Sequence, residues 1–116
     1  MTEEDLLDKA LEILEESGAA ESYRFILANK ACAGAHSSQL YNFLYCLGAA
    51  IGAKDESLKW MKEAIIGKGY WYRPEVFEDG DLDSVRAEAA FSECKKISDA
   101  RYNAALKNAA ALCTWK

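Results

Sequence analysis

Glu21-Ser22-Tyr23-Arg24-Phe25-Ile26 returns about 35 residues later as Glu56-Ser57-Leu58-Lys59-Trp60-Met61, and this near-repeat is the strongest guide to the fold. The two hexamers agree in class at every position: acidic, serine, apolar, basic, aromatic and aliphatic. A period of this length is typical of helical hairpins that stack, because each hairpin buries the apolar face of its neighbour. The sequence therefore predicts an all-α superhelix, a class of fold that mostly binds other molecules.

Helix signals extend on both sides of the hexamers. Thr2 with Asp5 forms an N-cap pattern, Gly18 provides a stop, and Asp55 is predicted to cap the helix that carries the second hexamer. The segment from Gly69 to Phe77 is rich in aromatic residues and contains the single proline, so we expect a loop with one short helical turn there. The predicted helices cover 3–17, a second stretch ending near Cys32, 39–51 as the most enclosed helix, 56–67 and 87–113.

Composition and charge limit the functional classes. A chain of 116 residues without an internal linker suits one domain, residues 1–116. The net charge of -5 argues against nucleic acid, whose phosphates require a basic surface. The acidic N-terminus does not resemble a secretory signal, and no apolar run approaches the roughly 20 residues of a membrane span. We therefore expect a cytoplasmic protein without membrane contact.

Residues suited to metal binding or catalysis are scattered along the sequence. The four cysteines form no closely spaced pair and His36 is the single histidine, so no metal or cofactor site is predicted and the cysteines read as buried thiols. A calcium loop that began at Asp79 would need glycine and glutamate where Ser84 and Ala90 stand. No nucleophile elbow or glycine-rich phosphate loop occurs. The sequence does not predict an enzyme.

Residues 39–91 resemble a tetratricopeptide repeat followed by the segment that closes such arrays in bacterial proteins. The resemblance rests on two groups of residues: Gly52, Asp55, Glu56, Ser57, Trp60, Met61 and Ala64 in the repeat, and Asp81-Leu82-Asp83-Ser84-Val85-Arg86 with Phe91 in the closing segment. It implies two degenerate helical hairpins and a C-terminal closing helix. Three positions depart from the family pattern, namely Lys30, Tyr45 and Ala89.

The same resemblance implies a shallow groove lined by the first helix of each hairpin. The residues at those positions are Asp5, Asp8, Glu12 and Glu15 in the first hairpin and Gln39 and Asn42 in the second. Such a groove would be negative and would suit a protein or peptide partner with basic residues. The alternative is that the acidic residues form a solvated face of an end helix and that Asn42 is an ordinary surface residue.

Two aromatic residues of the loop, Trp71 and Tyr72, stand beside Arg73, a composition typical of interface hot spots. They could equally fill the junction between the fourth helix and the closing helix. The function predicted overall is a non-catalytic protein-protein interaction module. The alternative is a self-associating structural homodimer that uses Trp71, Trp115 and the open side of the first helix.

Overall fold

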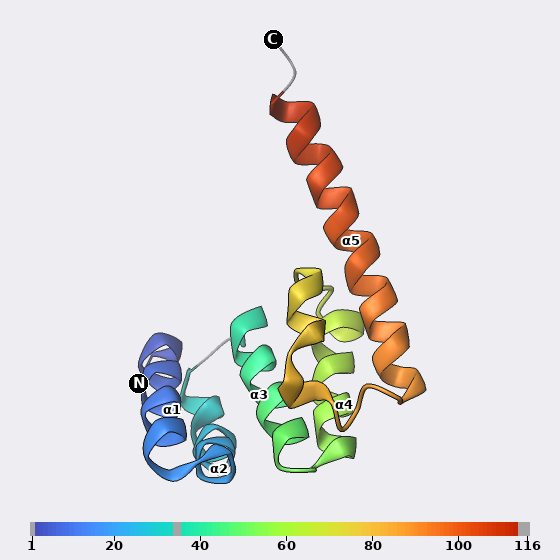
Figure 1. Ribbon diagram of the computed structural model, residues 1–116. Coiled ribbons are helices and arrows are strands. Elements are labelled where there is room, and N and C mark those ends of the chain that lie inside the picture. The colour runs from blue at the N-terminus through green and yellow to red at the C-terminus, as the bar shows by residue number, and fades with distance from the viewer. Residues whose placement is uncertain (1, 34–35, 114–116) are drawn as a thin grey trace.

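The computed structural model describes residues 2–33 and 36–113, and the regular elements in these residues are all helical (Figure 1). The all-α prediction is therefore confirmed. The main helices are α1 (Glu3–Ser17), α2 (Ala19–Asn29), α3 (Ser38–Ala50), α4 (Lys54–Lys62) and α5 (Ala89–Cys113). Short helical turns follow α2 at Lys30–Ala33, follow α4 at Glu63–Gly67, and lie before α5 at Pro74–Glu78 and Gly80–Leu82.

The helix ends follow from local chemistry. Thr2 and Asp5 form a reciprocal capping box at the start of α1, and Gly18 ends the helix with a φ of 93°, which favours glycine. Ser37 caps α3 by accepting from the N–H of Leu40. The prediction that Asp55 caps α4 is wrong, because Ala53 holds that position and Asp55 lies in the first turn. There its carboxylate complements the positive end of the helix dipole.

α1 with α2, and α3 with α4, form two hairpins with the same internal hydrogen bond. Ser22 donates to the carbonyl of Ala10 over 2.7 Å, and Ser57 donates to the carbonyl of Tyr45 over 2.6 Å. Both serines are fully buried and both reach back 12 residues. The serine of each hexamer therefore fastens the second helix of its hairpin to the first.

A polar cluster joins the two hairpins where α2 lies beside α3 and α4. The Tyr23 hydroxyl accepts from the indole N–H of Trp60 over 2.9 Å and donates to the Glu56 carboxylate over 2.8 Å. Lys30 and Lys59 place their ammonium groups 5.3 and 4.8 Å from the Trp60 ring centroid. All of these groups come from the two hexamers or their immediate surroundings, so the near-repeat also forms the contact between hairpins.

α3 lies at the centre of the fold and is the most enclosed of the described helices, as predicted. The segment after α4 crosses beside it and buries Phe77, Leu82 and Val85 completely. The first half of α5 closes the core with Phe91 and Cys94. The buried cluster therefore extends from α1 and α2 through α3 and α4 to the crossing segment and the start of α5.

The second half of α5 extends away from this helical body (Figure 1). The radius of gyration is 15.3 Å, whereas a compact chain of this length would have about 13 Å. A helix of 25 residues is about 37 Å long, longer than two of the three dimensions of the molecule, 51 × 34 × 24 Å. The protein therefore consists of a packed body and a projecting helix.

Candidate functional site

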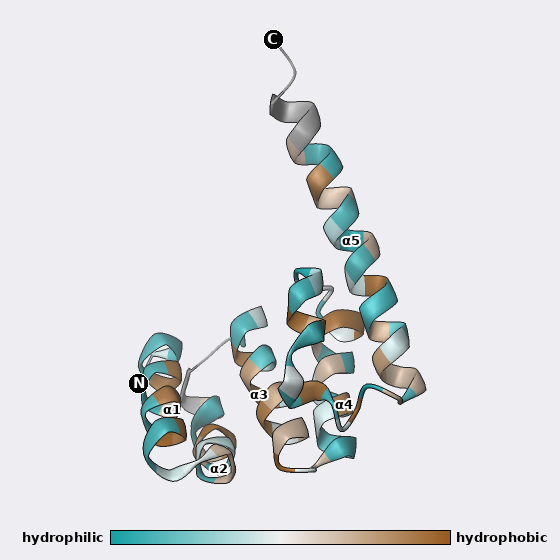
Figure 2. Ribbon diagram, viewed as in Figure 1, coloured by the Kyte–Doolittle hydropathy of each residue, from teal (hydrophilic) through white to brown (hydrophobic). Residues whose placement is uncertain are grey.

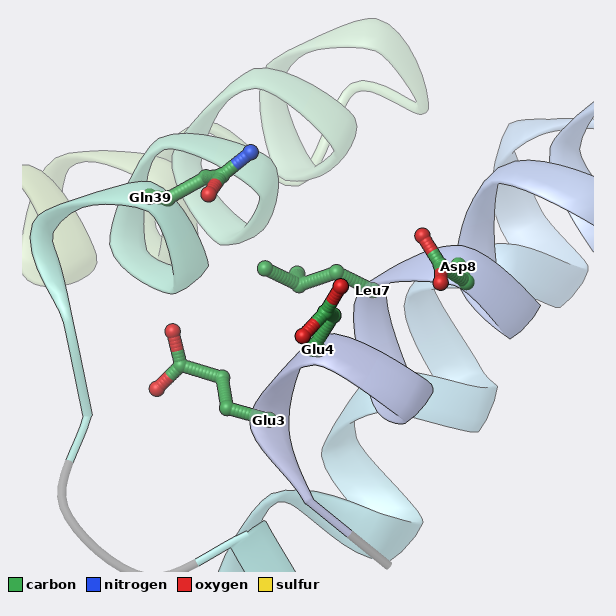
Figure 3. A pocket seen from close by; sticks show the side chains of 5 residues that line it. All are labelled: Glu3, Glu4, Leu7, Asp8 and Gln39. Atoms are coloured by element: carbon green, nitrogen blue, oxygen red, sulfur yellow. The ribbon is translucent and has the colours of Figure 1, made fainter.

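An acidic depression of about 400 Å³ lies between α1 and the start of α3 (Figure 3). Its lining residues are Glu3, Glu4, Leu7, Asp8 and Gln39. Leu7 extends from α1 toward Gln39 and forms the apolar part of the depression, with Glu4 and Asp8 beside it. Of the residues predicted to line a groove, the structure brings Asp8 and Gln39 together here.

Two acidic residues near the depression serve the fold. Glu3 accepts hydrogen bonds from both the N–H and the hydroxyl of Ser37, so it fastens the start of α3 to the start of α1. Asp5 accepts from the N–H of Thr2 over 3.3 Å within the capping box and lies outside the lining. The negative charge available to a partner therefore comes mainly from Glu4 and Asp8.

The remaining predicted groove residues do not line the depression. Glu12 lies 3.7 Å from the ammonium of Lys9 in an exposed ion pair, and Glu15 is exposed farther along α1. Asn42 donates to the Tyr45 hydroxyl over 2.9 Å and to the Cys46 sulfur over 3.7 Å. The amide hydrogens of Asn42 thus support α3 itself.

The two neighbouring aromatic residues of the loop have opposite orientations. Tyr72 is buried and donates its hydroxyl hydrogen to the carbonyl of Ser38 over 2.6 Å, so it packs at the junction beside α3. Trp71 is 42% exposed, and its ring centroid lies 5.8 Å from that of Tyr102 on α5. Trp71 is therefore the one of the two that a partner could contact. The partner of Trp71 on α5, Tyr102, was not among the residues predicted to bind a partner.

The acidic turn that includes Asp79 and Asp83 is organised by Arg86. The Arg86 guanidinium donates to the carbonyls of Phe77 and Asp79, the latter over 2.9 Å, and to the Asp83 carboxylate over 3.0 Å. The closing-segment motif read from the sequence thus contains an arginine that holds the turn together. In the described residues, no group of three or more histidine, cysteine or acidic side chains is placed to hold a metal ion.

The thiols of the core are poorly suited to nucleophilic chemistry. Burial raises the pKa of Cys46 to about 12, and Asp79 and Asp81 act in the same direction. Burial also raises the pKa of Cys94 to about 11. Because the thiolate is the reactive form, both groups are inert near neutral pH. Cys32 and Cys113 have side chains outside the described set.

Comparison with known proteins gives a family. Residues 2–106 match the profile of a family described as 'A/B hydrolase-like, N-terminal domain'. A crystal structure of an uncharacterized protein from Bacillus cereus ATCC 10987 superposes with a TM-score of 0.87 and 32% sequence identity. The match covers 92% of this chain and 35% of that one, so this chain spans about a third of its relative's length. No curated protein matches significantly.

The assignment to the tetratricopeptide family is wrong, because the matching profile is of a different family. The resemblance rested on residue classes that stacked helical hairpins in general require. Tyr45 marks the difference: a small residue is usual there in the tetratricopeptide pattern, whereas Tyr45 is fully buried and packs edge-on against Tyr72 at 5.5 Å. In residues 2–33 and 36–113, no helix has the length and apolar character to cross a membrane. The chain belongs to the A/B hydrolase-like N-terminal domain family.

Proposed function

We propose that the protein is a non-catalytic accessory domain that binds an α/β-hydrolase-like domain, either in the same polypeptide or as a separate chain. The observation that carries this proposal is the family match over residues 2–106, together with a solved relative in which the matched part is about a third of the chain. The remaining two-thirds of that relative is the natural candidate for what such a domain contacts.

The chemistry of the core supports a structural role for its polar side chains. The hydroxyls of Ser22 and Ser57 donate to helix carbonyls, and the Ser98 hydroxyl donates to the carbonyl of Tyr72. These groups hold helices and loops together. The raised pKa values of Cys46 and Cys94 favour their neutral forms. We also propose a cytoplasmic location, because buried free thiols suit a reducing compartment.

A chimera tests the accessory role. In this chimera, the whole 116-residue chain replaces the matched third of the Bacillus cereus relative. If the helical part binds the rest of that protein, its unfolding midpoint rises above that of the isolated chain, because the contact stabilises only the folded state. The two parts also tumble as one particle. Independent tumbling with an unchanged midpoint would contradict the proposal.

The acidic depression supports a second candidate function, the binding of a basic segment. Glu4 and Asp8 present carboxylates beside the apolar Leu7, which suits the stem and ammonium of a lysine side chain. Replacement of both by lysine should abolish binding of a short oligolysine peptide. The matched control reverses Glu15 and Glu16 on the same helix, away from the lining.

Titration calorimetry at low and physiological salt measures both variants. Binding through the depression predicts loss in the Glu4→Lys, Asp8→Lys variant and retention in the control, with affinity falling as the Debye length shortens to about 8 Å. Equal losses in the two variants would show that the peptide senses only net charge.

Self-association remains an alternative to both. Its support is the exposure of large apolar side chains, among them Leu11 at 44% and Trp71 at 42%. Trp115, which was also predicted for this contact, lies outside the described residues. Sedimentation over a wide concentration range decides it. A monomer at all concentrations would remove the homodimer.

A further inference from the structure

The apolar stripe of α5 continues beyond the body that it helps to close. Phe91, Cys94 and Ser98 are buried, and they recur at the three- and four-residue spacing of one helix face. Tyr102 and Ala105 continue that spacing and are half-buried, with Trp71 of the loop after α4 beside Tyr102. Figure 2 shows hydrophobic segments recurring along α5 after the helix leaves the other elements. A core-type face therefore continues along α5 with part of its surface uncovered.

Side chains from two elements build this uncovered surface. A depression of about 250 Å³ is lined by Trp71, Arg73, Tyr102, Ala105, Leu106 and Ala109. Leu106 is 50% exposed and Trp71 is 42% exposed, the former from α5 and the latter from the loop after α4. We call these six residues the α5 patch. Its combination of tryptophan, tyrosine and arginine is enriched at the energetic centres of interfaces.

The α5 patch is fixed in place before any partner arrives. Ser98 accepts from the N–H of Tyr72 over 2.7 Å, on the loop position next to Trp71. Arg101 donates to the carbonyl of Tyr70 over 3.0 Å and also to the carbonyl of Ile65. These bonds hold the loop on both sides of Trp71 against α5. A preorganised surface loses little conformational entropy on binding.

The charge near the α5 patch differs from that of the rest of the molecule. Arg73 is part of the lining, and Lys107 follows Leu106 on the exposed part of α5. The chain as a whole carries a net charge of -5, and its acidic depression lies in the α1–α3 region. The surface that fits the α5 patch is therefore apolar, with acidic residues at its edge.

We propose that the α5 patch is the surface that docks the α/β-hydrolase-like domain, an inference that rests on the function proposed above. The family profile extends to residue 106, so it includes most of the patch. About two-thirds of the Bacillus cereus chain lies outside the matched part and supplies a body large enough to cover a projecting helix. The occupant in this proposal is a hydrolase-like domain of the kind that the family description names, with an apolar, acid-edged contact surface.

Amide hydrogen exchange tests this assignment in the chimera described above, with the 116-residue chain alone as reference. We expect the amides of residues 101–109 to exchange at least about tenfold more slowly in the chimera, because a covered helix opens less often. Leu106→Asp should remove this added protection. The matched control is Leu11→Asp, since Leu11 is 44% exposed on α1 and lies outside the patch.

The outcomes separate the docking surface from the function on which it rests. Added protection at 101–109 that Leu106→Asp abolishes and Leu11→Asp retains supports the α5 patch. Added protection confined to α1 and α3 would overturn the patch while leaving the accessory role intact. Added protection nowhere in the 116 residues would contradict both. Equal loss with both variants would also overturn the patch, because the added protection would then not depend specifically on Leu106.

Discussion

The two hairpins share the same internal hydrogen bond but differ in what surrounds them. In each, a buried serine reaches back 12 residues to a carbonyl of the preceding helix, Ser22 to Ala10 and Ser57 to Tyr45. Yet α3 is enclosed by α2, α4 and the crossing segment, whereas α1 lies at the end of the stack. The difference shows that the hexamer specifies the internal packing of a hairpin. The position of the hairpin in the stack determines which of its surfaces a partner can reach.

Core truncation should give the largest contrast between the hairpins. Leu44 and Leu6 are both fully buried, the first in α3 and the second in α1. Leu44→Ala should lower the free energy of unfolding by about 3–5 kcal/mol and Leu6→Ala by about 2–3 kcal/mol, because an end helix can relax into the cavity more easily. Urea denaturation measures both. Equal losses in the free energy of unfolding for Leu6→Ala and Leu44→Ala would contradict the distinction between a helix at the end of the stack and one at its centre.

The contact between the hairpins should show the next largest effect. Tyr23→Phe removes the acceptor of the buried Trp60 N–H and the donor to Glu56. We expect a loss of about 1–3 kcal/mol in the free energy of unfolding, since an unpaired buried donor is costly. Tyr102→Phe is the control, because its hydroxyl makes no hydrogen bond with the described residues. Similar free energies of unfolding for the two variants would show that the Tyr23 hydrogen bonds do not stabilise the contact between the hairpins.

The same cluster predicts a loss of stability at high pH. Burial raises the pKa of Tyr23 from 10.0 to about 12; the Glu56 carboxylate adds to the rise and the Trp60 N–H opposes it. The folded protein thus favours the neutral phenol. The contribution of the Tyr23 hydroxyl to the free energy of unfolding is complete below pH 10 and is lost as pH rises through about 12. Tyr23→Phe should flatten part of this decline, measured by urea unfolding at several pH values. Other groups whose pKa values are raised by burial, among them Tyr41 and Cys46, keep the rest of the decline.

The smallest effect tests the equivalence of the hairpins. Ser22→Ala and Ser57→Ala should each lower the free energy of unfolding by about 1 kcal/mol, because each removes one buried hydrogen bond of similar length. Thermal unfolding of the two variants side by side measures the costs. A difference of more than about 1 kcal/mol between the two losses would mean that the two serines do not stabilise their hairpins equally.

Much of the fold follows from local sequence. Thr2, Gly18 and Ser37 mark helix ends through capping groups and glycine conformation, and the structure confirms the predicted helix 3–17. The fourth helix, predicted over 56–67, is instead α4 followed by a wider helical turn at Glu63–Gly67. There the N–H of Lys68 donates to the carbonyl of Glu63, five residues earlier. This wider hydrogen-bonding pattern depends on the neighbouring loop, so the residues of the turn alone do not predict it.

The candidate surfaces were less predictable, because they depend on contacts between distant elements. The resemblance to a helical repeat placed Asp8 and Gln39 in one predicted groove, but the contact that fixes the start of α3 beside α1, from Ser37 to Glu3, was not predicted. Trp71 and Tyr72 are neighbours of similar composition, and only the position of Ser38 and Ser98 determines which of them is buried. The end of the body beside Tyr102 is likewise a property of the whole fold.

A photo-crosslink from the projecting helix tests the central claim most directly. A photoreactive amino acid replaces Leu106 in the chimera and, in a separate preparation, replaces Leu11. Mass spectrometry then identifies the crosslinked peptides. Docking through the α5 patch predicts crosslinks from position 106 into the part of the chimera that comes from the Bacillus cereus relative, and none from position 11. Crosslinks from position 11 alone would contradict it, since the end of the stack would then be the docking surface and α5 would project into solvent.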